Sequence, residues 1–117
     1  MPPPRILVLE DSILVAMALQ AALEDRGHAV VSAGSLAAAH AALEDGPVVA
    51  ALLDLHLPDG DSSALAVFLH QSGCHVAILT GAADDLSGEL AAVPRFVKPT
   101  AFEEIVAWLD QRLAPPA

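Results

Sequence analysis

The chain has 117 residues, which is the usual size of one domain with its own hydrophobic core. Its 15 acidic residues against 5 basic ones give a formal net charge of −10, which argues against a surface that follows nucleic-acid phosphates or docks on anionic membrane. A single cysteine, Cys74, excludes an internal disulfide and a metal site built from several cysteines.

Strand and helix patterns alternate along the first half of the chain. The apolar run at 5–10 predicts a buried strand, and apolar residues at three- and four-residue spacing then predict a helix that ends at Gly27. A second strand is predicted at 28–33, followed by an alanine-rich helix at 35–45. The segment 48–53 is apolar throughout, which indicates a central strand.

The second half continues the alternation after a loop. A helix is predicted at 63–72 and a fourth strand at 75–80. Only one short helix, near 86–92, is expected before a fifth strand at 94–97, and the last helix is predicted at 102–113. Five strand–helix units predict an α/β fold with a doubly wound parallel sheet and helices on both of its faces. We expect a single domain over 1–117, with its core at about 5–113 and frayed proline-rich ends.

Polar side chains lie at or just after the ends of four of the five predicted strands. Glu10 and Asp11 end the first, Asp54 the third, Thr80 the fourth and Lys98 the fifth. Because parallel strands end at one edge of the sheet, we expect these side chains to lie close together. Neighbouring carboxylates repel each other unless a cation lies between them, and oxygen ligands favour magnesium, calcium or manganese over zinc. An aspartate in such a site can act as a nucleophile toward a phosphoryl group.

The motifs at these strand ends resemble those of the response-regulator receiver (CheY-like) domain family. They read ILVLED, LLDLHLPDGD, ILTG and FVKPT in chain order, and the resemblance spans the chain from about Arg5 to Leu113. The family resemblance implies a flavodoxin-like fold with strand order 2-1-3-4-5. The short interval between the last two motifs indicates a short or irregular fourth helix.

The resemblance also implies a role for each residue at the strand ends. Asp54 corresponds to the phosphoacceptor, Asp11 to a direct Mg²⁺ ligand, and Glu10 to the second acidic residue. The backbone carbonyl of His56 corresponds to a further protein ligand of the metal.

Two further residues correspond to the groups that contact the phosphoryl group in this family. Thr80 resembles the switch hydroxyl, and Lys98 resembles the lysine that pairs with the phosphoryl group. The implied function is two-component signalling, in which a histidine kinase or histidine phosphotransfer protein donates a phosphoryl group to Asp54. We expect a stand-alone receiver that is not an enzyme but promotes its own aspartyl phosphorylation and dephosphorylation. Its output is expected through an unknown downstream protein or onward phosphotransfer.

The sequence departs from the family pattern before the lysine. Arg95 stands where the family usually has an aromatic switch residue, and Phe96 should face the other way because side chains alternate along a strand. From Thr80 to Lys98 the chain advances 98 − 80 = 18 residues, which is short for the family. These departures leave open a receiver-like interaction module that no longer cycles phosphate.

A third hypothesis is a flavin- or nucleotide-binding protein on the same kind of sheet. It needs a glycine-rich phosphate loop after the first strand, where this chain instead has Glu10 and Asp11. Because the apolar run after Arg5 ends at Glu10, too soon for a secretory signal or a membrane span, we expect a cytoplasmic location.

Overall fold

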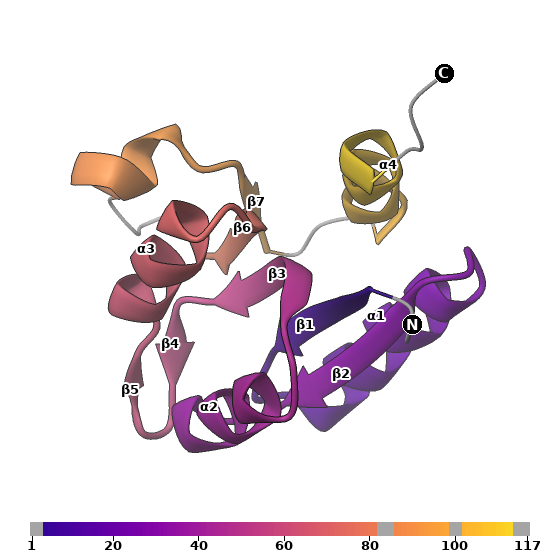
Figure 1. Cartoon of the computed structure of the whole chain (residues 1–117), viewed down its shortest axis with the longest axis horizontal. Coiled ribbons are helices and arrows are strands. Elements are labelled where there is room, and N and C mark those ends of the chain that lie inside the picture. The colour runs from indigo at the N-terminus through magenta and orange to yellow at the C-terminus, as the bar shows by residue number, and fades with distance from the viewer. Residues whose placement is uncertain (1–3, 82–85, 99–101, 114–117) are drawn as a thin grey trace.

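The computed structural model describes residues 4–81, 86–98 and 102–113, which include a five-stranded parallel sheet (Figure 1). The strand order is β2-β1-β3-β6-β7, which is 2-1-3-4-5 when the strands of this sheet are counted along the chain. The predicted doubly wound α/β fold is therefore confirmed. The strands of the sheet are β1 (Arg5–Leu9), β2 (Ala29–Ala33), β3 (Val48–Asp54), β6 (His75–Thr80) and β7 (Arg95–Val97).

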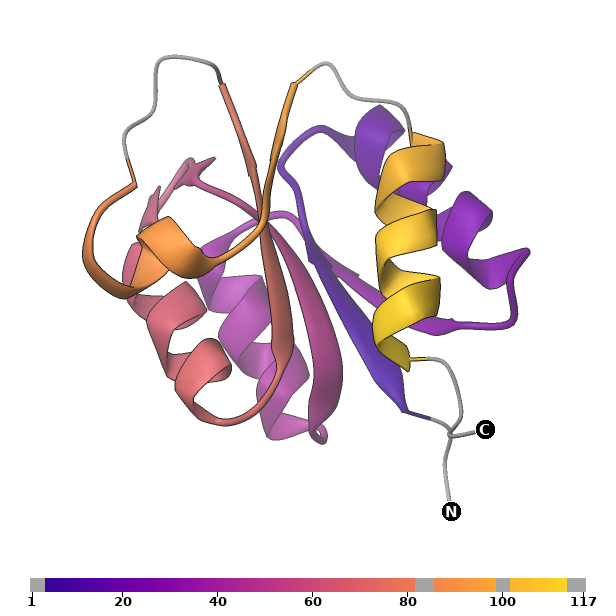
Figure 2. The same ribbon diagram turned by 90° about the horizontal axis from the view of Figure 1, so that it is seen from above.

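Helices cover both faces of the sheet (Figure 2). One face carries α1 (Ile13–Glu24) and α4 (Phe102–Leu113). The other face carries α2 (Leu36–Glu44), α3 (Ser63–Gln71) and a short 3₁₀ helix, η1 (Gly88–Ala92). None of the helices in the described ranges has both the length and the apolar character needed to cross a bilayer.

Side chains of β1 alternate between the two halves of the core. Ile6 and Val8 pack in the cluster beneath α1 and α4, whereas Leu7 and Leu9 pack in the cluster beneath α2 and α3. All four are buried, because a parallel strand in the centre of a sheet is covered on both faces. This double burial explains why the strand is apolar at every position rather than at every second one.

The loop after β3 contains an antiparallel hairpin that the sequence patterns do not predict. It consists of β4 (His56–Leu57) and β5 (Gly60–Asp61). At its turn, the Asp59 carboxylate accepts the backbone N–H groups of Leu36 at 2.9 Å and Ala37 at 3.1 Å. These bonds satisfy free N–H groups in the first turn of α2 and lower the pKa of Asp59. The hairpin is thereby fixed to the start of α2.

The segment before β7 is short, as predicted, and η1 is held against α3. The carboxylate of Glu89 bonds His70 Nδ1 at 2.8 Å and accepts from Gln71 Nε2 at 3.0 Å. Leu90 and Val93 are buried in the core beneath it.

The two side chains at the start of β7 face opposite ways, as strand alternation predicts. Arg95 is exposed and lines a small pocket with Leu86 and Val93, on the side of η1. Phe96 instead packs edge-on against Trp108 of α4, with ring centroids 6.2 Å apart. Trp108 therefore helps to pack α4 against the sheet.

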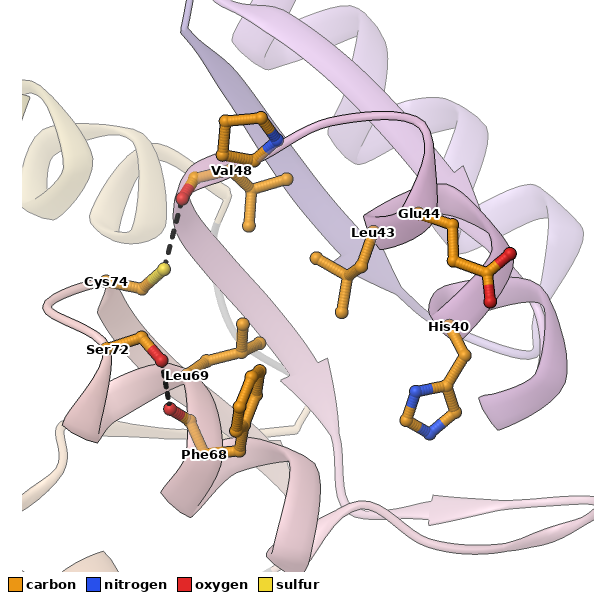
Figure 3. A pocket seen from close by; sticks show the side chains of 9 residues that line it. His40, Leu43, Glu44, Val48, Phe68, Leu69, Ser72 and Cys74 are labelled. Atoms are coloured by element: carbon orange, nitrogen blue, oxygen red, sulfur yellow. Dashed lines mark hydrogen bonds between the residues drawn. The ribbon is translucent and has the colours of Figure 1, made fainter.

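A pocket of about 450 Å³ opens between the ends of α2 and α3, at the amino end of β3 (Figure 3). Its wall includes Leu43, Val48 and the exposed ring of Phe68. The thiol of Cys74 donates a hydrogen bond to the Val48 carbonyl at 3.1 Å, and burial raises the pKa of this thiol. Cys74 is thus a protonated packing residue rather than a reactive thiolate.

Candidate functional site

The predicted site residues lie at the carboxyl edge of the sheet. Glu10 directly follows β1, Asp54 is the last residue of β3, and Thr80 is the last residue of β6. Lys98 directly follows β7 and bonds back to β6, since its backbone N–H donates to the Thr80 carbonyl at 2.8 Å. Because the strands are parallel, residues distant in the sequence meet at this one edge (Figure 2).

Three carboxylates come together there. Glu10, Asp11 and Asp54 each place one carboxylate oxygen so that all three atoms lie within 4.8 Å of one another. Glu10 and Asp54 are buried, whereas Asp11 is exposed and opens the cluster to solvent. The backbone N–H of Ser12 donates to Glu10 Oε1 at 3.1 Å, which orients that buried carboxylate.

Lys98 bridges two of these carboxylates. Its Nζ lies 2.7 Å from Glu10 Oε2 and 3.1 Å from Asp54 Oδ2. The side chain of Lys98 is 35% exposed, whereas those of Glu10 and Asp54 are 1% and 12% exposed. One ammonium facing three carboxylates leaves the cluster with excess negative charge.

The protonation of Asp54 reflects this imbalance. Burial raises the pKa of Asp54 most, the hydrogen bond from Lys98 lowers it, and the negative charges of Glu10 and Asp11 raise it again, to about 6. For Lys98, burial lowers the pKa, but the bonds and charges of Glu10 and Asp54 together outweigh burial and raise it. Lys98 makes its shorter contact with Glu10, so Asp54 remains the less compensated carboxylate.

The other two predicted site residues lie beside this cluster in the fold. Thr80 is buried, and its hydroxyl donates to the Gly81 carbonyl at 3.2 Å. His56 lies on β4, two residues after Asp54, and its side chain is exposed. Within the described residues, the cluster that could hold a metal contains only carboxylates, so the imidazole of His56 is not part of it.

Ser62 is hydrogen-bonded to Asp54, a contact that the sequence does not predict. Its hydroxyl donates to the Asp54 backbone carbonyl at 2.7 Å, and its side chain is fully buried. The Ser62–Ser63 pair before an apolar helix is typical of a helix cap, so no sequence signal separates this serine from an ordinary capping residue.

The donor set fits a hard divalent cation. Carboxylate oxygens at this spacing suit magnesium, calcium or manganese, and the exposed side of Asp11 leaves room for water ligands. A metal there would offset the excess negative charge that raises the pKa of Asp54. The arrangement can therefore present an ionised, partly buried aspartate oxygen beside a cationic lysine.

No family model matches the sequence. A curated relative, the transcriptional regulatory protein AruR of Pseudomonas aeruginosa, is 32% identical over 114 residues. The match covers 89% of this chain and 47% of AruR, so the chain spans about half the length of the curated relative it matches.

Solved structures match along almost the whole chain. The non-phosphorylated receiver domain of HemR from Leptospira biflexa is 26% identical with a TM-score of 0.80, and the match covers 97% of both chains. A CheY-like receiver domain protein from Methanospirillum hungatei has a TM-score of 0.81 at 23% identity, over 96% of this chain and 94% of that one. At 23% identity, the match to the Methanospirillum hungatei protein shows that the two chains share a fold.

Proposed function

Since this chain is a receiver domain of the response-regulator family, we propose that it accepts a phosphoryl group on Asp54 from a phosphohistidine donor. A histidine kinase or histidine phosphotransfer protein is the proposed donor, and an unknown downstream protein is the proposed reader. The observation that supports this most is the geometry of Lys98, which lies within 3.1 Å of the Asp54 carboxylate at the centre of an acidic cluster.

The proposed metal is Mg²⁺, held by Glu10, Asp11, Asp54 and the backbone carbonyl of His56. When bound, it would neutralise phosphoryl oxygens and the carboxylates around them. Asp54 must be ionised to react, and its pKa of about 6 leaves it largely ionised above pH 7.

Asp54, Lys98 and Thr80 each have a role in the proposed transfer. An oxygen of Asp54 forms the new O–P bond while the P–N bond to the donor imidazole breaks. Lys98 can contact the Asp54 carboxylate before the transfer and the oxygens of the transferred group after it. Its side chain is partly exposed and therefore has room to shift between the two positions. The hydroxyl of Thr80, at the end of the neighbouring strand, is the proposed second donor to that group.

A receiver-like module that no longer cycles phosphate is the second candidate. The side chains of β7 favour it. Arg95 is exposed, and Phe96 packs against Trp108 on the opposite face of the sheet. An aromatic ring that rotates between an exposed and a buried position at residue 95 is therefore absent. If phosphate cycles here, its signal must leave the site by another route.

A stability titration separates the two candidates. Magnesium at ten times its dissociation constant should raise the free energy of unfolding by about 1.4 kcal/mol, and beryllofluoride, a phosphoryl mimic, should raise it further. The measurement is urea unfolding at several magnesium concentrations. As a matched control, Asp25→Asn removes an exposed carboxylate at the far end of α1 and should leave the shift unchanged, whereas Asp11→Asn should reduce it. No shift in the wild type would favour the inert module.

A further inference from the structure

Ser62 occupies the N-cap position of α3, yet its hydroxyl does not cap the helix. An N-cap serine usually accepts a hydrogen bond from a backbone N–H in the first turn. Ser12 and Ser35 do so at the starts of α1 and α2, accepting from Val15 at 3.4 Å and Ala38 at 3.1 Å. The hydroxyl of Ser62 instead donates to the Asp54 carbonyl at 2.7 Å.

The start of α3 is satisfied by other groups. The carboxylate of Asp61 accepts the backbone N–H of Ser63 at 2.7 Å, and the Ser62 carbonyl accepts the first helical bond from Ala66 at 2.9 Å. The helix therefore does not depend on the Ser62 hydroxyl as an acceptor. The hydroxyl is available to hold the end of β3.

A second bond from Ser62 fixes the next residue along. Its backbone N–H donates to the Leu55 carbonyl at 3.0 Å, while the Leu55 N–H donates to Leu79 of β6 at 3.2 Å. Ser62 thus bonds two consecutive carbonyls, those of Asp54 and Leu55, and closes the loop that contains the β4–β5 hairpin. The backbone between Asp54 and His56 is therefore held by Ser62 on one side and by β6 on the other.

We propose that Ser62 is a positioning residue for Asp54: its buried hydroxyl holds the Asp54 carbonyl so that the carboxylate stays in reach of Lys98, Glu10 and Asp11. This inference rests on the proposed phosphoacceptor role of Asp54. Ser62 is 0% exposed, so water cannot replace its hydroxyl without a rearrangement of the loop. The same clamp orients the backbone that leads to the His56 carbonyl, the proposed further ligand of the metal.

The test compares two removal variants with a matched control. Ser62→Ala and Ser62→Gly each delete the clamp hydroxyl. Ser72 Oγ donates to the Phe68 carbonyl at 2.8 Å (Figure 3). Ser72→Ala deletes this hydroxyl at the C-cap of α3, the opposite end of the helix from Ser62. Ser62→Thr keeps a hydroxyl and serves as the rescue variant.

At saturating magnesium and saturating phosphoramidate, a small phosphodonor, Ser62→Ala should react about tenfold to a hundredfold more slowly than the wild type. Ser72→Ala should react at the wild-type rate, and Ser62→Thr should recover most of the loss. Without metal or phosphodonor, hydrogen exchange at the Leu55 N–H should be faster in Ser62→Ala than in Ser72→Ala. Urea unfolding checks that each variant is folded during the assay.

The outcomes distinguish this inference from the function on which it rests. A wild type that takes up no phosphoryl group contradicts the proposed function. If the wild type takes up the phosphoryl group and Ser62→Ala does so at the same rate, the positioning role of Ser62 is overturned. Failure of both Ser62→Ala and Ser62→Gly to fold would also overturn it, because the hydroxyl would then serve the fold as a whole.

Discussion

Replacing Lys98 with alanine should lower the free energy of unfolding by about 2–3 kcal/mol at pH 7 in metal-free buffer. The substitution leaves the Glu10 carboxylate, whose side chain is 1% exposed, without its cation. Removing one partner of a fully buried ion pair costs about 3–5 kcal/mol, and the value here is reduced because the Lys98 side chain is 35% exposed. Urea unfolding with magnesium chelated measures the change.

Two controls identify the cause of this loss. The double variant Glu10→Gln with Lys98→Ala removes both charges and should recover much of the stability, because no unpaired buried charge remains. Magnesium should also recover part of it in Lys98→Ala, since the metal supplies positive charge to the same carboxylates. An unchanged unfolding midpoint in Lys98→Ala would show that the ion pair does not hold this edge of the sheet together.

Replacing Asp54 with asparagine should raise the free energy of unfolding by about 3 kcal/mol at pH 7.5 in metal-free buffer, since a pKa change of one corresponds to about 1.4 kcal/mol. The pKa of Asp54 is raised from 3.8 to about 6, chiefly by burial. Between these two values the folded protein binds more protons at this site than the unfolded chain does, so wild-type stability falls as the pH rises from about 4 to about 6. Asparagine does not ionise and therefore removes this loss.

The pH profile of unfolding is the measurement for Asp54. The difference between Asp54→Asn and wild type should be small near pH 4 and reach its full size above pH 6. Asp59→Asn provides a control of opposite sign, because hydrogen bonds from Leu36 and Ala37 lower the pKa of Asp59. That variant should lose stability at neutral pH, and the loss should shrink as the pH falls. A pH-independent difference for Asp54→Asn would contradict the burial argument.

Much of the fold follows from the sequence because the elements have clear patterns. The strand at His75–Thr80 and the helix at Phe102–Leu113 have the bounds that the apolar patterns predict. The gathering of Glu10, Asp54 and Lys98 is predictable for a related reason: parallel strands end at one edge, and these residues end or follow three of them.

Other features of the site depend on geometry that no periodicity records. The strands of the β4–β5 hairpin have two residues each, too few for an alternating pattern to appear within 54–62. The preference of Lys98 for Glu10 over Asp54 depends on differences of a few tenths of an ångström. The role of Ser62 depends on the direction of one hydroxyl, which the sequence presents as an ordinary helix cap.

We propose that Asp54 is the residue that carries the phosphoryl group. Intact-mass spectrometry after incubation with magnesium and a small phosphodonor tests it most directly, with wild type and Asp54→Asn compared side by side. We expect the added mass of one phosphoryl group in the wild type, no added mass when magnesium is chelated, and no added mass in Asp54→Asn. Equal addition to both proteins, or none to the wild type, would contradict it.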